Sequence, residues 1–245
     1  MSVVMMLRRP FEQTHEFVDT SSTNMAEIIQ MNDEGLNMLH EGYIDAAETM
    51  LFNCLHEARE LMPLVGELHC IAEAVQSLES RPLGRALGPD DSWHGYQADH
   101  FVMCRFTFTF NSSNREWIEF GPSLPILFRA VVTYNLGLIY HHQGLLNSDV
   151  PLLSQAGDLY SWGIDLLRIY RGPAQGKETS LLDLALYNNL GHLYSILGDI
   201  EGMARCKEML QYALTLPQPS QTTTAVFESS LSLSRDPSPR FASSA

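Results

Sequence analysis

Two stretches of the chain share one pattern, LGLIYHHQG at residues 136–144 and LGHLYSILG at residues 190–198. A weaker copy runs through Gly35, Met38 and Gly42. In each copy a second glycine follows the first after seven residues, closing one apolar helical pattern and opening another. This arrangement predicts a helix-turn-helix unit that stacks on copies of itself.

Apolar residues at helical spacing extend this pattern along the chain. They predict helices over residues 23–43, 44–62, 64–78, 124–143, 152–170, 181–197 and 200–214. Glycine and proline are frequent between Arg81 and Pro125, which is typical of loops. Within that stretch the alternation of Phe106 to Phe110 predicts a half-buried strand. We expect Trp117 to Phe120 to return beside it as a β-hairpin.

These elements predict a mainly α fold, an antiparallel helix-pair superhelix with an inserted β-hairpin. We expect residues 1–22 to be a flexible N-terminal segment and residues 23–216 to form one helical-repeat domain. The insertion covers about residues 81–123 of that domain. Residues 217–245 are rich in Ser, Thr and Pro, a composition that predicts a disordered tail.

The helix pairs resemble the tetratricopeptide repeat, which carries Leu-Gly-x-x-Tyr on its first helix and Ala-x-x-x-Phe-x-x-Ala on its second. The matching residues are Gly35, Met38, Ala47, Leu51 and Cys54 in the first copy, Leu136, Gly137, Tyr140, Ala156, Tyr160 and Gly163 in the second, and Leu190, Gly191 and Tyr194 in the third. The run of residues 185–194 is also similar to tetratricopeptide-like proteins of diatoms. The step from Gly137 to Gly191 is 54 residues, against about 34 in a regular array. The resemblance therefore implies an interrupted array of three pairs.

Glycine inside a helix costs about 1 kcal/mol relative to alanine, so a glycine there needs a compensating contact. At Gly35, Gly137 and Gly191 we expect it from the close approach of a small residue on the neighbouring helix. Tyr140 and Tyr194 are expected to fill the space between successive pairs.

Charge and composition restrict the classes of partner. The 245 residues carry a formal net charge of −14, of which −11 falls within the first 80 residues (3 basic and 14 acidic). An acidic surface repels phosphate, so nucleic acid and anionic membrane are poor partners. The charge is interpreted as solvated helix faces, with a basic partner as the alternative. No apolar run approaches the roughly 18 residues of a membrane-spanning helix.

The four cysteines, Cys54, Cys70, Cys104 and Cys206, show no C-x-x-C pair and no regular spacing. We interpret them as buried thiols rather than as a disulfide framework or a zinc site. The first residues lack the apolar stretch of a secretory signal, which predicts a cytoplasmic or nuclear protein. No cofactor is expected.

In tetratricopeptide-repeat proteins the first helices of the pairs line a concave groove. The resemblance assigns to this groove Asn32, His40, Tyr134, Leu138, His141, His142, Asn188, His192 and Ser195. Amides, imidazoles and a phenol can hydrogen-bond an extended peptide, so we expect a non-catalytic adaptor that binds a protein or peptide. The groove presents no Lys or Arg, which disfavours capture of an acidic C-terminal tail. In the competing interpretation Asn188 and Asn189 bridge neighbouring turns and the histidines are ordinary polar surface.

An enzyme or metal-binding module is the alternative function. His141, His142 and His192 could bind a transition metal or supply a general base. Adjacent residues on a helix point about 100° apart, so His141 and His142 do not form a chelating pair. No carboxylate stands at helical spacing to orient either ring.

Overall fold

The structure is a computed structural model that describes residues 25–60, 78–83, 101, 103–110, 124–171 and 180–216. Its elements are α1 (Met25–Glu41), α2 (Ile44–Glu60), β1 (Leu78–Pro82), β2 (Phe106–Phe110), α4 (Leu124–Asn147), α5 (Val150–Arg171), α6 (Leu181–Leu197) and α7 (Ile200–Thr215). A mainly helical chain with a small antiparallel sheet is thus confirmed. The helix predicted over residues 64–77, the return strand at 117–120 and both terminal segments lie outside the described residues.

Two-residue turns join α1 to α2, α4 to α5 and α6 to α7, and each turn begins with a residue of positive φ. Gly42 and Gly198 have φ of 89° and 74°, in the left-handed region that glycine adopts without steric cost. Ser148, with φ 52°, takes this place between α4 and α5. Gly144, predicted to close the first helix of its pair, instead lies inside α4. A Cβ there would be 2.7 Å from Leu153, so glycine permits the close approach of α5.

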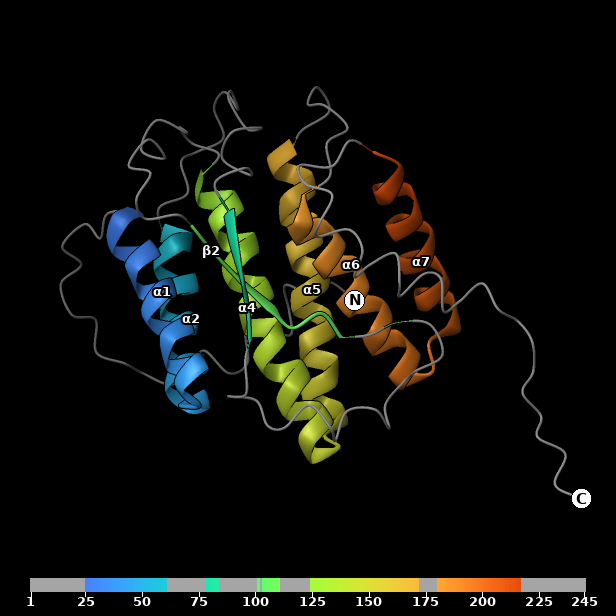
Figure 1. Ribbon diagram of the computed structural model, residues 1–245, viewed down its shortest axis with the longest axis horizontal. Coiled ribbons are helices and arrows are strands. Elements are labelled where there is room, and N and C mark those ends of the chain that lie inside the picture. Colours follow the sequence, from blue (N-terminus) through green and yellow to red (C-terminus); the bar gives the residue numbers. More distant parts are fainter. Residues whose placement is uncertain are drawn as a thin grey trace, which may run out of the picture.

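The helices stack in chain order, each packing on the next described helix, from α1 and α2 at one end to α7 at the other (Figure 1). Apolar side chains from every helix join one buried core. Tyr140 of α4 donates a hydrogen bond of 2.8 Å to Glu48 of α2, and the half-buried Tyr194 of α6 lines a pocket together with Ser161 of α5. Both tyrosines therefore lie between successive pairs, as expected. None of the described helices is long and apolar enough to span a membrane.

The strand predicted at Phe106–Phe110 is confirmed as β2, but the expectation that it is half-buried is wrong, because Thr107 and Thr109 are buried as well as Phe108 and Phe110 on the other face. Its partner also differs from the expected one. β2 pairs antiparallel with β1, in a register that places Leu78 opposite Phe110 and Pro82 opposite Phe106. Leu78 was expected to end a helix and instead begins β1. The prediction for Leu78 was wrong because periodicity reports local pattern alone, whereas this strand is held by a partner far along the chain.

Both strands lie against one face of the helical array, where β2 packs on α1 and α4 (Figure 1). Phe108 meets Tyr134 edge to face with ring centroids 5.0 Å apart, and Phe110 stacks on Phe128 at 5.6 Å. All four of these rings are buried. β2 is thus packed into the core along the inner helices.

Candidate functional site: an extended segment across the inner helices

The residues just before β2 continue across the helices toward α6, and we name Phe101 and Met103–Phe110 the crossing segment. Two asparagines bind its backbone. Asn189 of α6 accepts a hydrogen bond from the Cys104 N–H at 2.6 Å and donates one to the Cys104 carbonyl at 3.0 Å. Asn135 of α4 does the same for Phe108, at 3.0 Å and 2.8 Å. Each carboxamide therefore satisfies both backbone groups of one residue.

The backbone groups of the crossing segment are divided between β1 and the helices. Alternate residues of an antiparallel strand direct their N–H and C=O to the partner strand. The Arg105 carbonyl accepts from the Leu83 N–H at 2.8 Å, on the side of β1. Cys104 and Phe108 direct theirs the other way, to α6 and α4. The two asparagines thus replace a second neighbouring strand.

Side chains of the crossing segment also enter the helical face. The ring of Phe101 lies on Gly191, where an added Cβ would be 2.5 Å from Phe101 Cζ. Thr109 donates a hydrogen bond to the carboxylate of Asp33 on α1. The segment therefore contacts α6, α4 and α1, the first helix of every described pair.

The first glycine of each repeat copy contacts larger side chains than the small residues expected there. A Cβ at Gly35 would meet Leu51 of α2 at 3.1 Å, and one at Gly137 would meet Tyr160 of α5 at 2.8 Å. Large side chains therefore fill the space above these glycines. The expectation of a neighbouring helix is met at Gly35 and Gly137 and is wrong at Gly191, which Phe101 covers.

A buried polar network surrounds Asn189. Its Nδ2 lies 3.3 Å from the hydroxyl oxygens of both Tyr134 and Tyr160. Tyr160 Oη lies 3.3 Å from His141 Nδ1, and His141 Nε2 lies 2.9 Å from His192 Nδ1. Tyr134 also donates to the Cys104 carbonyl at 3.3 Å. The network ties α4, α5 and α6 to the crossing segment.

Burial determines the charge of this network. It lowers the pKa of His141 well below 6.5, and the neighbouring His192 and His142 lower it further. A neutral imidazole carries one N–H and one acceptor nitrogen. Tyr160 can therefore donate to Nδ1 of His141 while Nε2–H donates to His192. Burial likewise raises the pKa of both tyrosines well above 10, so their hydroxyls stay protonated.

The structure brings most of the predicted groove residues together, but beneath the crossing segment. Seven of them are buried: Asn32, Tyr134, Leu138, His141, His142, Asn188 and His192. Asn32 accepts from Asn135 at 3.2 Å, and Asn188 donates to Asn189 at 3.3 Å. The interpretation of His141, His142 and His192 as ordinary polar surface is wrong, because the folded chain covers them.

The remaining two predicted residues lie at the edge of this site. His40, near the end of α1, is half-buried, and its pKa is lowered by burial and by the nearby Arg81 of β1. Ser195 is half-buried near the end of α6. Within the described part of the chain, neither is hydrogen-bonded to the network around Asn189.

Sequence reasoning did not assign Asn135, Asn189 or Asp33 to the groove. All three stand two residues before the glycine of their copy, at Gly137, Gly191 and Gly35. The shared position was the available signal. The predicted residues were taken from flanking positions, which point elsewhere because each step along a helix rotates the side chain by about 100°.

The histidines expected for a metal or catalytic centre are partly assembled. His141 and His192 are in contact, and both ring nitrogens of His141 have neighbours within 3.3 Å. Among the described residues there is no group of three or more His, Cys, Asp or Glu side chains placed to hold a metal ion. The histidine hypothesis stays a prediction.

The described cysteines match their interpretation as buried thiols. Cys54, Cys104 and Cys206 are free and buried, and Cys70 lies outside the described residues. Burial raises the pKa of the Cys104 thiol to about 11 and that of Cys206 to about 12. Thiolates are the reactive form, so these side chains are chemically quiet while buried.

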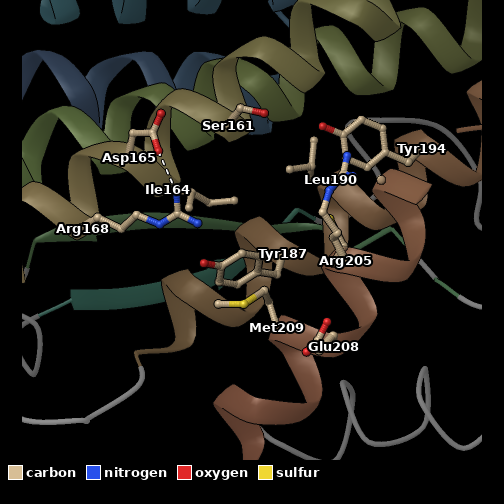
Figure 2. A pocket seen from close by; sticks show the side chains of 12 residues that line it. Ser161, Ile164, Asp165, Arg168, Tyr187, Leu190, Tyr194, Arg205, Glu208 and Met209 are labelled. Carbon is tan, nitrogen blue, oxygen red and sulfur yellow. Dashed lines mark hydrogen bonds and ion pairs between the residues drawn. The ribbon is translucent and has the colours of Figure 1, made fainter. Parts of the chain in front are cut away.

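A separate pocket of about 380 Å³ lies between α5, α6 and α7 (Figure 2). Tyr187 and Tyr194 of α6 line it together with residues of α5 and α7. Arg168 pairs with Asp165 at 3.0 Å, and Arg205 pairs with Glu201 at 2.6 Å. Both ion pairs are well exposed and join residues of a single helix, so they add little to stability.

Comparison of the chain with protein-family models, with curated proteins and with solved structures finds no match. Functional inference therefore depends on the geometry of the site itself.

Proposed function

We propose that this chain is a non-catalytic adaptor of the tetratricopeptide-repeat kind, which binds an extended polypeptide along α1, α4 and α6. The observation that carries the proposal is the pair of asparagines, each hydrogen-bonded to the N–H and the C=O of one extended residue. On the side of the bound segment these bonds involve only backbone groups, so any extended chain without proline at those two positions can form them. Asn135 and Asn189 also occupy equivalent positions of two repeat copies, as expected of a surface built by repetition.

Charge supports a protein partner. The net charge of −14 opposes phosphate-rich ligands, and a basic or neutral polypeptide meets no such repulsion. Three described thiols are free, which is usual in a reducing compartment. The proposal therefore takes the protein to be cytoplasmic or nuclear, with protein segments as ligands.

A displayed library of random peptides, selected on the full chain, tests this function. In the Phe101→Ala background, where the crossing segment competes less for the two carboxamides, we expect selected peptides to bind with a Kd that rises at least about tenfold in both Asn135→Leu and Asn189→Leu, because leucine has similar volume and no hydrogen-bonding groups. Asn53→Leu is the matched control, since Asn53 is exposed on α2. Far-UV circular dichroism checks that each variant is folded.

Two outcomes would contradict the proposed function. If no peptide binds the full chain, or if selected peptides bind all three variants equally, the asparagines do not recognise a polypeptide ligand. Stoichiometric zinc or iron in the purified protein, lost on changing His141 and His192, would favour the metal-centre alternative instead.

A further inference from the structure

Resting on the proposed function, we infer that the crossing segment is an internal copy of the ligand. The partner is then an extended segment of another protein with aromatic residues at its first, eighth and tenth positions, corresponding to Phe101, Phe108 and Phe110. It binds by displacing the crossing segment. Backbone spacing, side-chain contacts and shared hydrogen-bonding groups support this inference independently.

The spacing of the two asparagines selects an extended ligand. Asn189 binds Cys104 and Asn135 binds Phe108, four residues further on. Four residues of a strand cover about 13 Å, whereas four residues of an α-helix cover about 6 Å. A helical ligand therefore cannot reach both carboxamides in this register. Proline at the fourth or eighth position would lack the N–H that each carboxamide accepts from.

Three aromatic contacts select the side chains. Gly191 leaves space for a ring, and Phe101, which is 2% exposed, fills it. Phe108 meets Tyr134 edge to face, and Phe110 stacks on Phe128. Aromatic pairs in these arrangements contribute beyond the area they bury. A ligand with the same spacing would make all three contacts.

Ligand and crossing segment are mutually exclusive because they need the same groups. The carboxamide of Asn189 is fully engaged by Cys104 and the neighbouring tyrosines. Cys104 itself reports the exchange. It is 3% exposed with a thiol pKa raised to about 11, and release would expose it and return the pKa toward 9.0. Its alkylation rate therefore measures displacement.

The test uses the full chain and a labelled decapeptide with the sequence of residues 101–110, with serine at the cysteine position and a lysine tail for solubility. Fluorescence anisotropy gives its Kd, and mass spectrometry follows alkylation of Cys104. We expect saturating peptide to raise that alkylation rate at least about tenfold. Proline at position eight, or alanine at position one, should weaken binding about tenfold or more.

Two protein variants identify the register. Phe101→Ala weakens the internal segment, so the peptide should bind it more tightly than the unaltered chain. Gly191→Ala is tested in the Phe101→Ala background, where the internal segment has no ring at this place. There it should weaken the parent peptide and leave the alanine-one peptide nearly unchanged. Tyr187→Ala, in the pocket of Figure 2, is the control and should have no effect.

Several outcomes overturn the inference while leaving the proposed function intact. One is peptide binding with Cys104 still protected; another is loss of binding in Tyr187→Ala but not in Gly191→Ala. Absence of decapeptide binding, with library peptides still dependent on Asn135 and Asn189, has the same meaning. If library peptides also ignore the two asparagines, both proposals fail.

Discussion

Asn-Leu-Gly occurs at residues 135–137 in α4 and at residues 189–191 in α6, and the two copies differ in what their glycine contacts. In both, the asparagine binds the backbone of the crossing segment. Gly137 faces Tyr160 of its own pair, whereas Gly191 faces Phe101 of the crossing segment. The same motif therefore packs one helix on another in α4 and seats an extended chain in α6.

The helices that follow the two copies, α5 and α7, also differ. α5 brings the large Tyr160 over Gly137, where its hydroxyl also enters the polar network. α7 matches the repeat poorly, with Lys207 where an aromatic residue is expected. The three atoms nearest to a Cβ at Gly191 all belong to Phe101. At Gly191 the crossing segment thus takes the place that Tyr160 of α5 takes at Gly137.

Replacing the two asparagines removes the feature that both copies share, their bonds to the backbone of the crossing segment. We expect these changes to have the largest effects on stability. Asn189→Leu leaves the buried Cys104 N–H without an acceptor, which costs about 1–3 kcal/mol, and removes one of the hydrogen bonds to the Cys104 carbonyl and to each of two tyrosine hydroxyls. We expect the free energy of unfolding in urea to fall by about 3–5 kcal/mol. Asn135→Leu should lose about 2–3 kcal/mol, because the Asn135 carboxamide contacts Phe108 and Asn32 rather than two tyrosine hydroxyls.

The exposed Asn53→Leu is again the control, with an expected change below about 0.5 kcal/mol. Equal losses for Asn53→Leu and Asn189→Leu would show that the carboxamide bonds to Cys104 contribute nothing to the stability of the fold.

Alanine at the two glycines tests the feature in which the copies differ, the side chain that contacts each glycine. Overpacking costs about 1–3 kcal/mol, so both Gly191→Ala and Gly137→Ala should destabilise the fold. The cost at Gly191 should largely disappear when Phe101→Ala is present as well, since the added methyl then meets no ring. The cost at Gly137 should persist in that background, because its neighbour is Tyr160. Chemical denaturation of the three single and two double variants measures both couplings.

Coupling of Phe101 with Gly137 instead of Gly191 would contradict the assignment of these contacts. Additive effects at both glycines would mean that the ring moves aside without energetic consequence.

Most of the fold was predictable because its signals are local. α1 and α7 bury one face, so their apolar residues recur at helical spacing, whereas α4 and α6 are buried over most of their surface and are apolar over most of their length. In β2 the phenylalanines alternate with threonines, and this alternation indicates a strand. β1 was not predictable. Glu79, Ser80, Arg81 and Pro82 have low strand propensity, and their pairing depends on β2.

The candidate site was predictable in part, since the predicted residues Tyr134, His141 and His192 take part in its polar network. Equivalent helix faces indicated an extended ligand, yet a shift of one residue separated Asn188 from Asn189, which makes the bonds to Cys104. Nothing in the residues of the helices indicates that a segment of the same chain lies there. That contact depends on long-range packing, for which a pattern within one helix carries no signal.

The two copies also differ in a titratable group, because His141 of α4 corresponds to the half-buried Ser195 of α6. The pH dependence of stability should therefore depend on the copy in α4 at this position. The folded pKa of His141 lies well below the ordinary 6.5, so the unfolded chain binds the extra proton first. The contribution of the neutral His141 to the free energy of unfolding is therefore fully present above pH 6.5 and is lost as the pH falls below it. The slope from this group is at most about 1.4 kcal/mol per pH unit.

Urea unfolding between pH 7.5 and 5 measures this slope. His141→Gln should flatten it, since the variant has no imidazole to protonate there, whereas His56→Gln removes only an exposed imidazole of α2 and should keep it. An unchanged slope in His141→Gln would assign the pH dependence to other groups.

The smallest expected effects are at the tyrosines that link each copy to the preceding pair. Tyr140→Phe removes the 2.8 Å hydrogen bond to Glu48 and should cost about 1 kcal/mol, because the acceptor is a carboxylate in a partly buried place. Tyr194→Phe removes only the hydroxyl of a half-buried tyrosine that lines a pocket beside Ser161 and should cost about 0.5 kcal/mol or less. Adding Glu48→Gln to Tyr140→Phe should cost little more, since the two changes remove one interaction. A larger loss in Tyr194→Phe than in Tyr140→Phe would place the stronger link between α5 and α6, and the irregular final pair would then be the better anchored of the two.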